Sequence, residues 1–244
     1  MSDIEECAKA ASEFAKLGST SLEATEKLGG YLAKNFGEIF TNAIGLVIGD
    51  KILYLRSEKN WDRHLRMLDK VNKDLLERNC KTIRLIPPKL EIPLVINASL
   101  EDDDNLQDIW CRLIANALDS NFNLEIRFAY IDIIKNLTPL DAKVLKFAYD
   151  EVSRKFGISQ KEPARVYMAK MIVDLKGINK CMDVSEEELT ISYNNLIRVQ
   201  CLKLVSSLSP MYVEEGEKMP SMLSDPMHVI ITPLGLAFIE ACMK

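Results

Sequence analysis

Apolar positions recur at helical spacing through most of the chain and predict a mainly α-helical fold. The clearest helix is predicted over residues 99–119. Ser99 is its expected N-cap, with Asp102 three residues later returning the bond, and the acidic residues around it suit the positive end of the helix dipole. Its buried stripe comprises Ile109, Trp110, Leu113, Ile114, Ala117 and Leu118. We therefore interpret the carboxylates as a helix start rather than as a catalytic cluster.

A long amphipathic helix is predicted over residues 56–78. Its apolar stripe, expected to face the core, comprises Trp61, Leu65, Leu68, Val71 and Leu75. On the other side, cations recur every three or four residues and form a basic stripe: Arg56, Lys59, Arg63, Arg66, Lys70 and Lys73. Residues 51–89 hold eleven Lys or Arg and five Asp or Glu, a net charge of +6 in a chain whose net charge is −5.

The basic stripe is the predicted binding site, because regularly spaced cations suit phosphates, an anionic membrane surface or an acidic protein. The charge pattern itself nevertheless favours a solvated or self-complementary face over a partner-binding one. Asp62 lies four residues before Arg66, and Asp69 lies four before Lys73, so pairing within the helix would weaken the positive field. Residues 90–129 carry a net charge of −6 and would neutralise the stripe within one chain or between two copies.

Residues 39–55 form the most apolar window of the chain, and with the residues from Phe36 they make up an apolar segment over 36–55. Glycines recur around it: Gly29, Gly30, Gly37, Gly45 and Gly49. Close packing between helices is the favoured explanation, because a missing side chain lets two backbones approach each other. The alternative is a hairpin that inserts into membranes under some conditions. Polar residues interrupt the window, which falls short of the ~20 apolar residues of a membrane-spanning helix.

Prolines and threonines mark the expected boundaries of several other elements. Three prolines in residues 82–93 predict an extended connector, and a short helix is predicted over residues 127–136. Thr138-Pro139 and Thr232-Pro233 each predict a helix start, with threonine as the N-cap and proline as the first helical residue.

The C-terminal part is predicted as helices over 139–155, 164–175 and 185–196, an apolar segment over 202–205, a polar loop, a strand over 229–232 and a final helix. This order resembles a winged helix-turn-helix in which residues 211–231 form the wing. Residues 180–244 hold five Lys or Arg against nine Asp or Glu, so protein contacts are favoured over DNA binding. The expected domains are a helical region, 1–136, and a winged-helix-like region with a small β-hairpin, 137–244.

Catalytic chemistry has little support in the sequence. Motifs of nucleotide binding, serine hydrolases, zinc proteases and kinases are absent, and the two histidines, His64 and His228, lie far apart. The cysteines show no metal-binding spacing and are expected to be reduced thiols: Cys7, Cys80, Cys111, Cys181, Cys201 and Cys242. We expect no enzymatic activity, metal, cofactor or small-molecule substrate. The acidic N-terminus lacks the pattern of a secretory signal, which favours a cytoplasmic location.

Four segments, taken in order, resemble the bacterial abortive infection alpha (Abi-alpha) family. They are the glycine-containing helix over 26–34, the turn at 87–90, the tryptophan-containing helix over 98–119 and the helix start at 137–142. The resemblance covers residues 20–145 and extends more loosely over the remainder. It implies an intracellular bacterial protein associated with defence against phage, and it brings no catalytic residues to this chain.

The expected function is therefore that of a cytoplasmic antiphage protein that binds a protein or a polyanion through the basic stripe and does not act as an enzyme. The expected partner is another protein or a second copy of the chain, with nucleic acid as a further candidate. Two other functions are kept as alternatives. One is a membrane-perturbing effector that uses residues 36–55, and the other is a DNA-binding regulator that uses the winged region.

Overall fold

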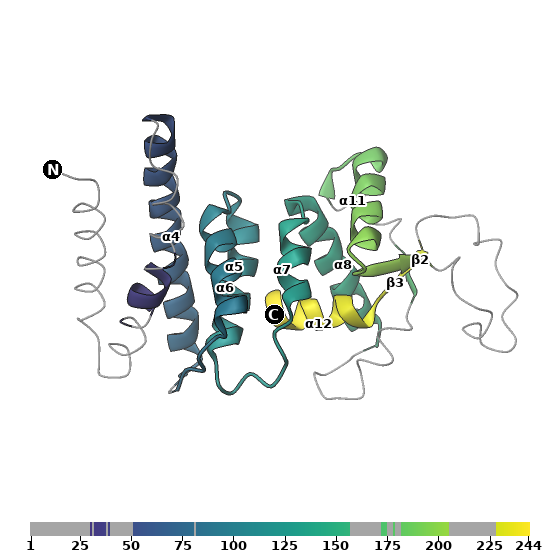
Figure 1. Ribbon diagram of the computed structural model, residues 1–244. Coiled ribbons are helices and arrows are strands. Elements are labelled where there is room, and N and C mark those ends of the chain that lie inside the picture. Colours follow the sequence, from purple (N-terminus) through teal and green to yellow (C-terminus); the bar gives the residue numbers. More distant parts are fainter. Residues whose placement is uncertain are drawn as a thin grey trace, which may run out of the picture. The chain divides into compact units, whose positions relative to one another are not determined.

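The computed structural model of the chain describes residues 30, 32–37, 39, 51–80, 82–156, 172–174, 178, 182–204 and 228–244. These segments contain seven α-helices, one π-helix and three short strands, so the fold is mainly α-helical, as predicted. The chain divides into two compact units, Met1–Lys135 and Asn136–Lys244, which we call the N-terminal and the C-terminal unit. Figure 1 shows the elements of both units.

The described part of the N-terminal unit is helical. Its elements are η1 (Leu32–Phe36), α4 (Lys51–Glu77), α5 (Pro88–Leu100), α6 (Asp104–Leu118) and α7 (Phe128–Lys135). Both α4 and α7 pack on α5 and α6 (Figure 1). The core holds Trp110, Leu113 and Ile114 of α6, each at most 1% exposed. The whole predicted apolar stripe of this helix is buried, so that prediction is confirmed.

The start of α6 differs from the prediction. Helix α5 continues to Leu100, and α6 begins at Asp104, after the N-cap Asp103. The Asp103 carboxylate accepts hydrogen bonds from two backbone N–H groups of the first turn. Ser99 is instead buried inside α5, where its hydroxyl donates to the Val95 carbonyl. The predicted Ser99 cap is therefore wrong, although the acidic residues do mark a helix start.

Residues 82–87 are non-helical, as the predicted connector over residues 82–93 requires, but α5 contradicts that prediction from Pro88 onward. Pro88 is its first residue, where a missing N–H costs nothing because that group has no partner within the helix. Pro93 lies inside the helix and removes one backbone hydrogen bond. The Asn97 side chain donates to the Pro93 carbonyl at 2.6 Å. Burial of the neighbouring Leu94, which is fully inaccessible to solvent, helps to offset the cost of the internal proline.

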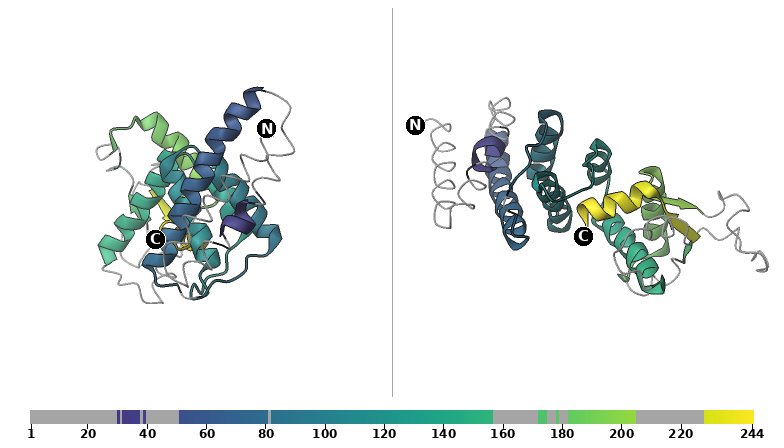
Figure 2. Two further views of the ribbon diagram at one scale, coloured as in Figure 1. Left: turned by 90° about the vertical axis from the view of Figure 1, so that its left-hand side faces the viewer. Right: turned by 90° about the horizontal axis from the view of Figure 1, so that it is seen from below.

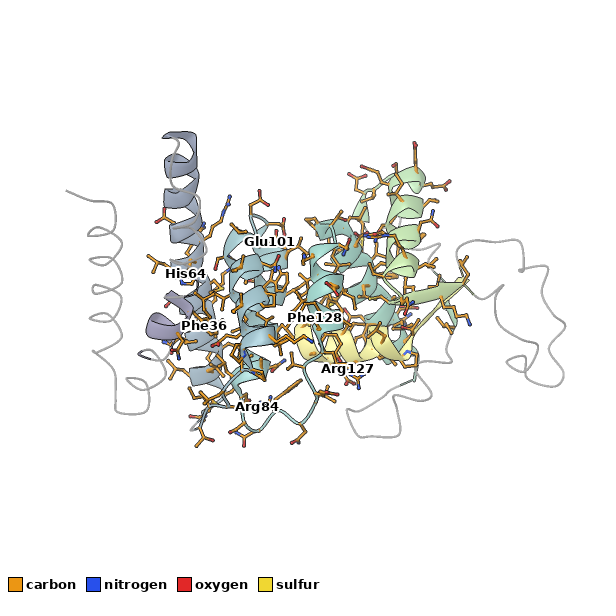
Figure 3. The ribbon with its side chains drawn as sticks, in the orientation of Figure 1. Phe36, His64, Arg84, Glu101, Arg127 and Phe128 are labelled. Carbon is orange, nitrogen blue, oxygen red and sulfur yellow. The ribbon has the colours of Figure 1, made fainter. Side chains whose placement is uncertain are left out.

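The short non-helical segment before α5 contacts the C-terminal end of α6. Ile83 forms an antiparallel bridge with Asp119. The Arg84 backbone donates to the Leu118 carbonyl, and its guanidinium donates to two further carbonyls of the same turn. These carbonyls have no partners within the helix, so Arg84, labelled in Figure 3, caps the negative end of α6.

The C-terminal unit combines helices with a small sheet (Figure 2). Its elements are α8 (Pro139–Phe156), β1 (Ile172–Asp174), α11 (Glu186–Arg198), β2 (Leu202–Leu204), β3 (His228–Ile231) and α12 (Pro233–Cys242). The strands form an antiparallel sheet in the order β1-β3-β2, with Ile230 of β3 opposite both Ile172 and Lys203. The strand predicted over 229–232 is present as β3, and the apolar segment over 202–205 contains β2. Strand β1 lies where a helix was predicted over 164–175.

Three predicted helix starts in this unit are confirmed. The Thr232 hydroxyl accepts a hydrogen bond from the first turn of α12 at 2.9 Å. Thr138 and Asp141 exchange backbone-to-side-chain hydrogen bonds at the start of α8. Ser185 forms a reciprocal capping box with the glutamate three residues later in α11. Each arrangement satisfies N–H groups that have no acceptor within their helix.

Asp141 connects the start of α8 to α11 inside the C-terminal unit. The residue is 1% exposed. Its Oδ1 accepts from the Ser192 hydroxyl at 2.6 Å, and its Oδ2 accepts from Asn195 Nδ2 at 2.8 Å and from the Thr138 N–H at 2.7 Å. Asn195 also donates to the Asn136 carbonyl at 2.7 Å. Three donors thus stabilise one buried carboxylate at the contact between two helices.

Helix α12 closely approaches the turn between α11 and β2 at Gly235. An ideal Cβ added to Gly235 would lie 2.3 Å from the Cys201 carbonyl oxygen, and that carbonyl is fixed by a hydrogen bond from the Thr232 N–H. Only glycine fits this contact without movement. Gly30 and Gly37, by contrast, have open space where a Cβ would lie. The close helix packing that the N-terminal glycines predict is therefore absent at these two positions.

Several predictions fall on residues that the structure does not describe. Most of the apolar segment, 36–55, and most of the proposed wing, 211–231, lie outside the described residues. Phe36, at the start of that apolar segment, is fully buried (Figure 3). In the part of the chain that the structure covers, no helix combines the length and the apolar character needed to span a membrane.

Candidate binding surface on helix α4

Helix α4 turns one face toward α5 and α6. Its buried residues are His64, Met67, Leu68, Val71 and Leu75, each at most 1% exposed. They recur every three or four residues or lie side by side, as expected for one face of a helix. This face differs from the predicted one in including His64 and Met67, whereas Leu65 is only half-buried. The Trp61 side chain, also predicted to face inward, lies outside the described residues.

Polar contacts along one edge of the buried face connect α4 to α6. Lys70 forms an ion pair with Asp108 at 2.7 Å and donates to the Gln107 side chain at 3.2 Å. Gln107 in turn donates to the Arg63 carbonyl at 3.4 Å. Asp108 belongs to the acidic segment 90–129, so at Lys70 the positive charge is neutralised within the chain.

A second polar cluster lies one turn further along α4. Arg78 donates to both carboxylate oxygens of Asp74 at 2.8 Å and also to the Asn116 side chain. Arg112 of α6 forms an ion pair with the same Asp74 at 3.4 Å. Asp74 thus contacts two guanidinium groups, and both cations contribute to packing of α4 against α6 rather than to a free basic surface.

The outward face of α4 carries five exposed charged residues. We call the first four the outward row: Asp62, Arg66, Asp69 and Lys73. Glu77 continues this face at the end of the helix. The four members of the row are spaced by four, three and four residues and therefore follow one face of the helix. Their charges alternate in sign. Among the ion pairs between described side chains, none involves a member of this row.

The structure distributes the six predicted cations unequally. Arg66 and Lys73 lie in the outward row, Lys70 is paired with Asp108, and Arg63 is half-buried. Arg56 and Lys59 lie within α4, with side chains outside the described residues. The four described cations therefore do not form one continuous exposed stripe.

The sequence predicted that Asp62 and Asp69 lie beside Arg66 and Lys73 and pair with them within the helix. All four side chains are exposed, and neither pair is among the ion pairs of the described residues. Alternating charges cancel at a distance, so the row favours a surface with complementary charges over a uniform polyanion.

His64 is a buried polar residue on the inward face of α4 (Figure 3). Its Nδ1 lies 2.8 Å from the Ser99 hydroxyl oxygen, and Ser99 donates to the Val95 carbonyl at 2.6 Å. Because the single hydroxyl proton is used on Val95, His64 Nδ1 is the donor to Ser99. Burial lowers the pKa of His64 to about 4. The imidazole is therefore neutral at pH 7 and has a structural role between α4 and α5.

Lowering the pH from 7 to 5 is expected to destabilise the N-terminal unit by about 2 kcal/mol through His64. The unfolded chain binds a proton near the ordinary pKa of 6.5, whereas the folded chain does so near 4. Stability from this residue is therefore complete above pH 6.5 and is lost as the pH falls toward 4. Urea unfolding followed by tryptophan fluorescence reports this unit, because Trp61 and Trp110 both lie in it.

His64→Gln is the matched control for this titration, since His228 is the one other histidine in the chain. The variant should be less stable at pH 7 and should show a smaller loss between pH 7 and pH 5. Parallel pH profiles of the wild-type protein and the variant would contradict the assignment to His64.

Three of the four described cysteines are buried structural thiols, and Cys80 is half-buried. Cys80, Cys111, Cys201 and Cys242 are free. Burial raises the pKa of Cys111 and Cys201 to about 12 and raises the pKa of Cys242 well above its ordinary value. Since the thiolate is the reactive form, these three are poor nucleophiles at pH 7. Among the described residues, no group of three His, Cys, Asp or Glu is arranged to hold a metal ion.

Helix α11 corresponds to the helix predicted over 185–196, the third helix of the predicted winged region. Leu189, Ser192 and Leu196 are buried on its inner face. Glu186 and Glu187 are exposed near its start, and the outer Ile191 is 63% exposed. This surface is acidic around an apolar side chain and therefore does not suit the phosphates of a DNA backbone.

Comparison with known proteins gives one match. The model of a family described as abortive infection alpha matches residues 58–242. The matched residues begin within α4 and end at the last residue of α12, so they include elements of both units. No curated protein and no solved structure matches the chain.

Proposed function

Because this chain belongs to the abortive infection alpha family, we propose that it is an antiphage protein that acts in the bacterial cytoplasm by binding a protein partner, without catalysing a reaction. The family match over residues 58–242 is the observation that carries the antiphage role. The mode of action is argued from the surface of the chain itself, since a fold does not determine a function.

The outward row of α4 supports a protein as the partner. Arg66 and Lys73 are exposed, and no intramolecular ion pair of the described side chains uses them. Asp62 and Asp69 lie beside them, so a nucleic acid or an anionic membrane would meet as many negative as positive charges along the row. A protein surface can supply opposite charges at each position.

Polar groups elsewhere in the structure support a binding protein rather than an enzyme. Asp141 already accepts three hydrogen bonds, and His64 is a neutral donor within the core. Burial keeps the thiols of Cys111 and Cys201 protonated at pH 7. Free thiols also suit the reducing conditions of a cytoplasm.

The C-terminal unit is proposed to be a winged-helix-like module used for protein contacts. Its support is the antiparallel sheet β1-β3-β2 together with α8 and α11, which pack on each other. The exposed glutamates at the start of α11 favour a protein over DNA as the partner of this unit.

Reversing both cations of the outward row is expected to abolish protection against phage. The double variant Arg66→Glu, Lys73→Glu makes every charge in the row negative, so a partner with complementary charges is repelled. Phage plating on cells that express the variant should rise to about the level seen with an empty vector. Affinity purification from infected cells should lose the partner that the wild-type protein recovers.

A matched control reverses two exposed lysines of α8, Lys143→Glu and Lys146→Glu, which changes the net charge equally. This control should retain protection and the partner. If the outward-row variant protects cells as well as the wild-type protein does, the proposed binding mode is wrong. If nucleic acid or membrane lipid is the specific molecule recovered with the wild-type protein, the proposal of a protein partner is wrong.

A further inference from the structure

The outward row is complementary to itself when two copies of α4 run antiparallel. A twofold axis between residues 67 and 68 places Asp62 opposite Lys73 of the second copy and Arg66 opposite Asp69 of the second copy. The symmetry repeats both contacts, so four opposite-charge pairs form along a row about 16 Å long. Beyond the row, the same axis places Glu77 opposite Glu58 of the second copy, which is a like-charge contact.

The alternating pattern also excludes the competing arrangement. In a parallel, in-register pair, each charge would face its own copy, which places Asp62 against Asp62 and Arg66 against Arg66. All four contacts would then be repulsive. Among twofold-symmetric pairs, the order of signs therefore favours the antiparallel direction.

Three other charged residues, in α4 and just after it, form contacts elsewhere and leave the row available. Lys70, Asp74 and Arg78 make hydrogen bonds or ion pairs within the N-terminal unit. The inward face, with His64 and Met67, packs on α5 and α6. The outward row is thus exposed on a helix whose opposite face is held by the core.

We infer that the outward row binds a second copy of this chain, with the two α4 helices antiparallel. This inference rests on the proposed function in using the same surface, and it identifies the protein partner as the chain itself. Each exposed ion pair contributes little affinity, so the outward row is expected mainly to set the direction and the register of the two α4 helices in the dimer. Association should weaken as the salt concentration rises, because salt screens exposed charges.

Two single reversals test the pairing directly. Arg66→Glu places a glutamate opposite Asp69 twice in a homodimer, and Asp69→Arg places an arginine opposite Arg66 twice. Each variant alone should show self-association weakened roughly tenfold or more in sedimentation velocity. When the two variants are mixed, every pair is again opposite in sign. The mixture should therefore form a heterodimer, which two different affinity tags will recover.

The mixture also controls for folding, because only folded chains can restore the contact. Lys143→Glu, exposed on α8, is the charge control and should associate as the wild-type protein does. A wild-type protein that stays monomeric over the accessible concentration range overturns the inference. So does a dimer that neither variant weakens, or a mixture that fails to associate.

Phage protection separates this inference from the proposed function. The double variant Arg66→Glu, Asp69→Arg restores the charge pairs in a homodimer, and it should protect cells if the second copy is the partner that matters. A double variant that dimerises without protecting would show that the antiphage role needs a different protein on this surface. A third outcome is that the wild-type protein is monomeric and the single variants still lose protection. This result would support the proposed function and overturn the homodimer.

Discussion

Replacing Asp141 with alanine is expected to destabilise the C-terminal unit by about 3 kcal/mol. The substitution leaves the Ser192 hydroxyl, the Asn195 amide and the Thr138 N–H without the acceptor that they share. Loss of a partner costs more at a buried site than at the surface, because water cannot replace the acceptor there. Asp141→Asn should lose less, since its carbonyl oxygen can still accept two of the three bonds and its amide can face Ser192.

Hydrogen exchange read by mass spectrometry is the suitable measurement for Asp141, because both tryptophans lie in the other unit. Protection of the α8 and α11 amides should fall in Asp141→Ala. Asp150→Ala, at an exposed position of α8, is the control and should change protection little. Equal effects of the two substitutions would contradict a structural role for the buried carboxylate.

Gly235→Ala is expected to destabilise the C-terminal unit by about 2 to 3 kcal/mol, because the new methyl group overlaps a fixed backbone. Helix propensity alone predicts the opposite sign, a gain of about 1 kcal/mol for alanine over glycine. The contact between Gly235 and Cys201 decides which of these two effects is larger. An added Cβ would lie 2.3 Å from the Cys201 carbonyl oxygen, which cannot rotate away as the end of a side chain could.

Exchange protection of α12 and β2 is the measurement for Gly235→Ala, with Ala237→Gly in the same helix as the comparison. Ala237→Gly should cost about 1 kcal/mol through propensity alone. Gly235→Ala should cost more than this and should loosen the start of β2 as well. A stabilised Gly235→Ala variant would show that the α12 backbone moves away from Cys201 readily.

Helix starts were predictable because their determinants lie within a few residues of one another. Thr138 and Thr232 cap helices whose first residue is proline, and Ser185 has the glutamate of a capping box three residues later. These residues act on the backbone beside them, so no distant contact is needed to identify them. The Asp103 cap follows the same rule, although the sequence reading placed it at Ser99.

Helix α5 was not predictable from local preferences. Pro88 and Pro93 favour an extended chain when read in isolation. In the fold, Pro88 occupies the one helical position where proline is harmless, and burial of Leu94 and Val95 outweighs the bond lost at Pro93. The decisive contribution is tertiary packing, which a single sequence does not display.

Strand β1 and the outward row show two further limits. Ile172–Asp174 pairs with His228–Ile231, more than fifty residues away along the chain, and no local signal specifies that register. The spacing of the outward row can be read from the sequence, but the pairing of Lys70 with Asp108, which removes Lys70 from the basic stripe, cannot. Knowing which charges the fold uses was therefore necessary to know which remain on the surface.

The strand order of the C-terminal unit has a consequence for biosynthesis. Strand β3 occupies the middle of the sheet, yet the ribosome makes it after β1 and β2. The two earlier strands have no partner in this sheet until β3 emerges, so the unit cannot complete folding early during translation. The N-terminal unit can mature first, and a nascent chain that stalls before His228 would expose unpaired strand edges to chaperones and proteases.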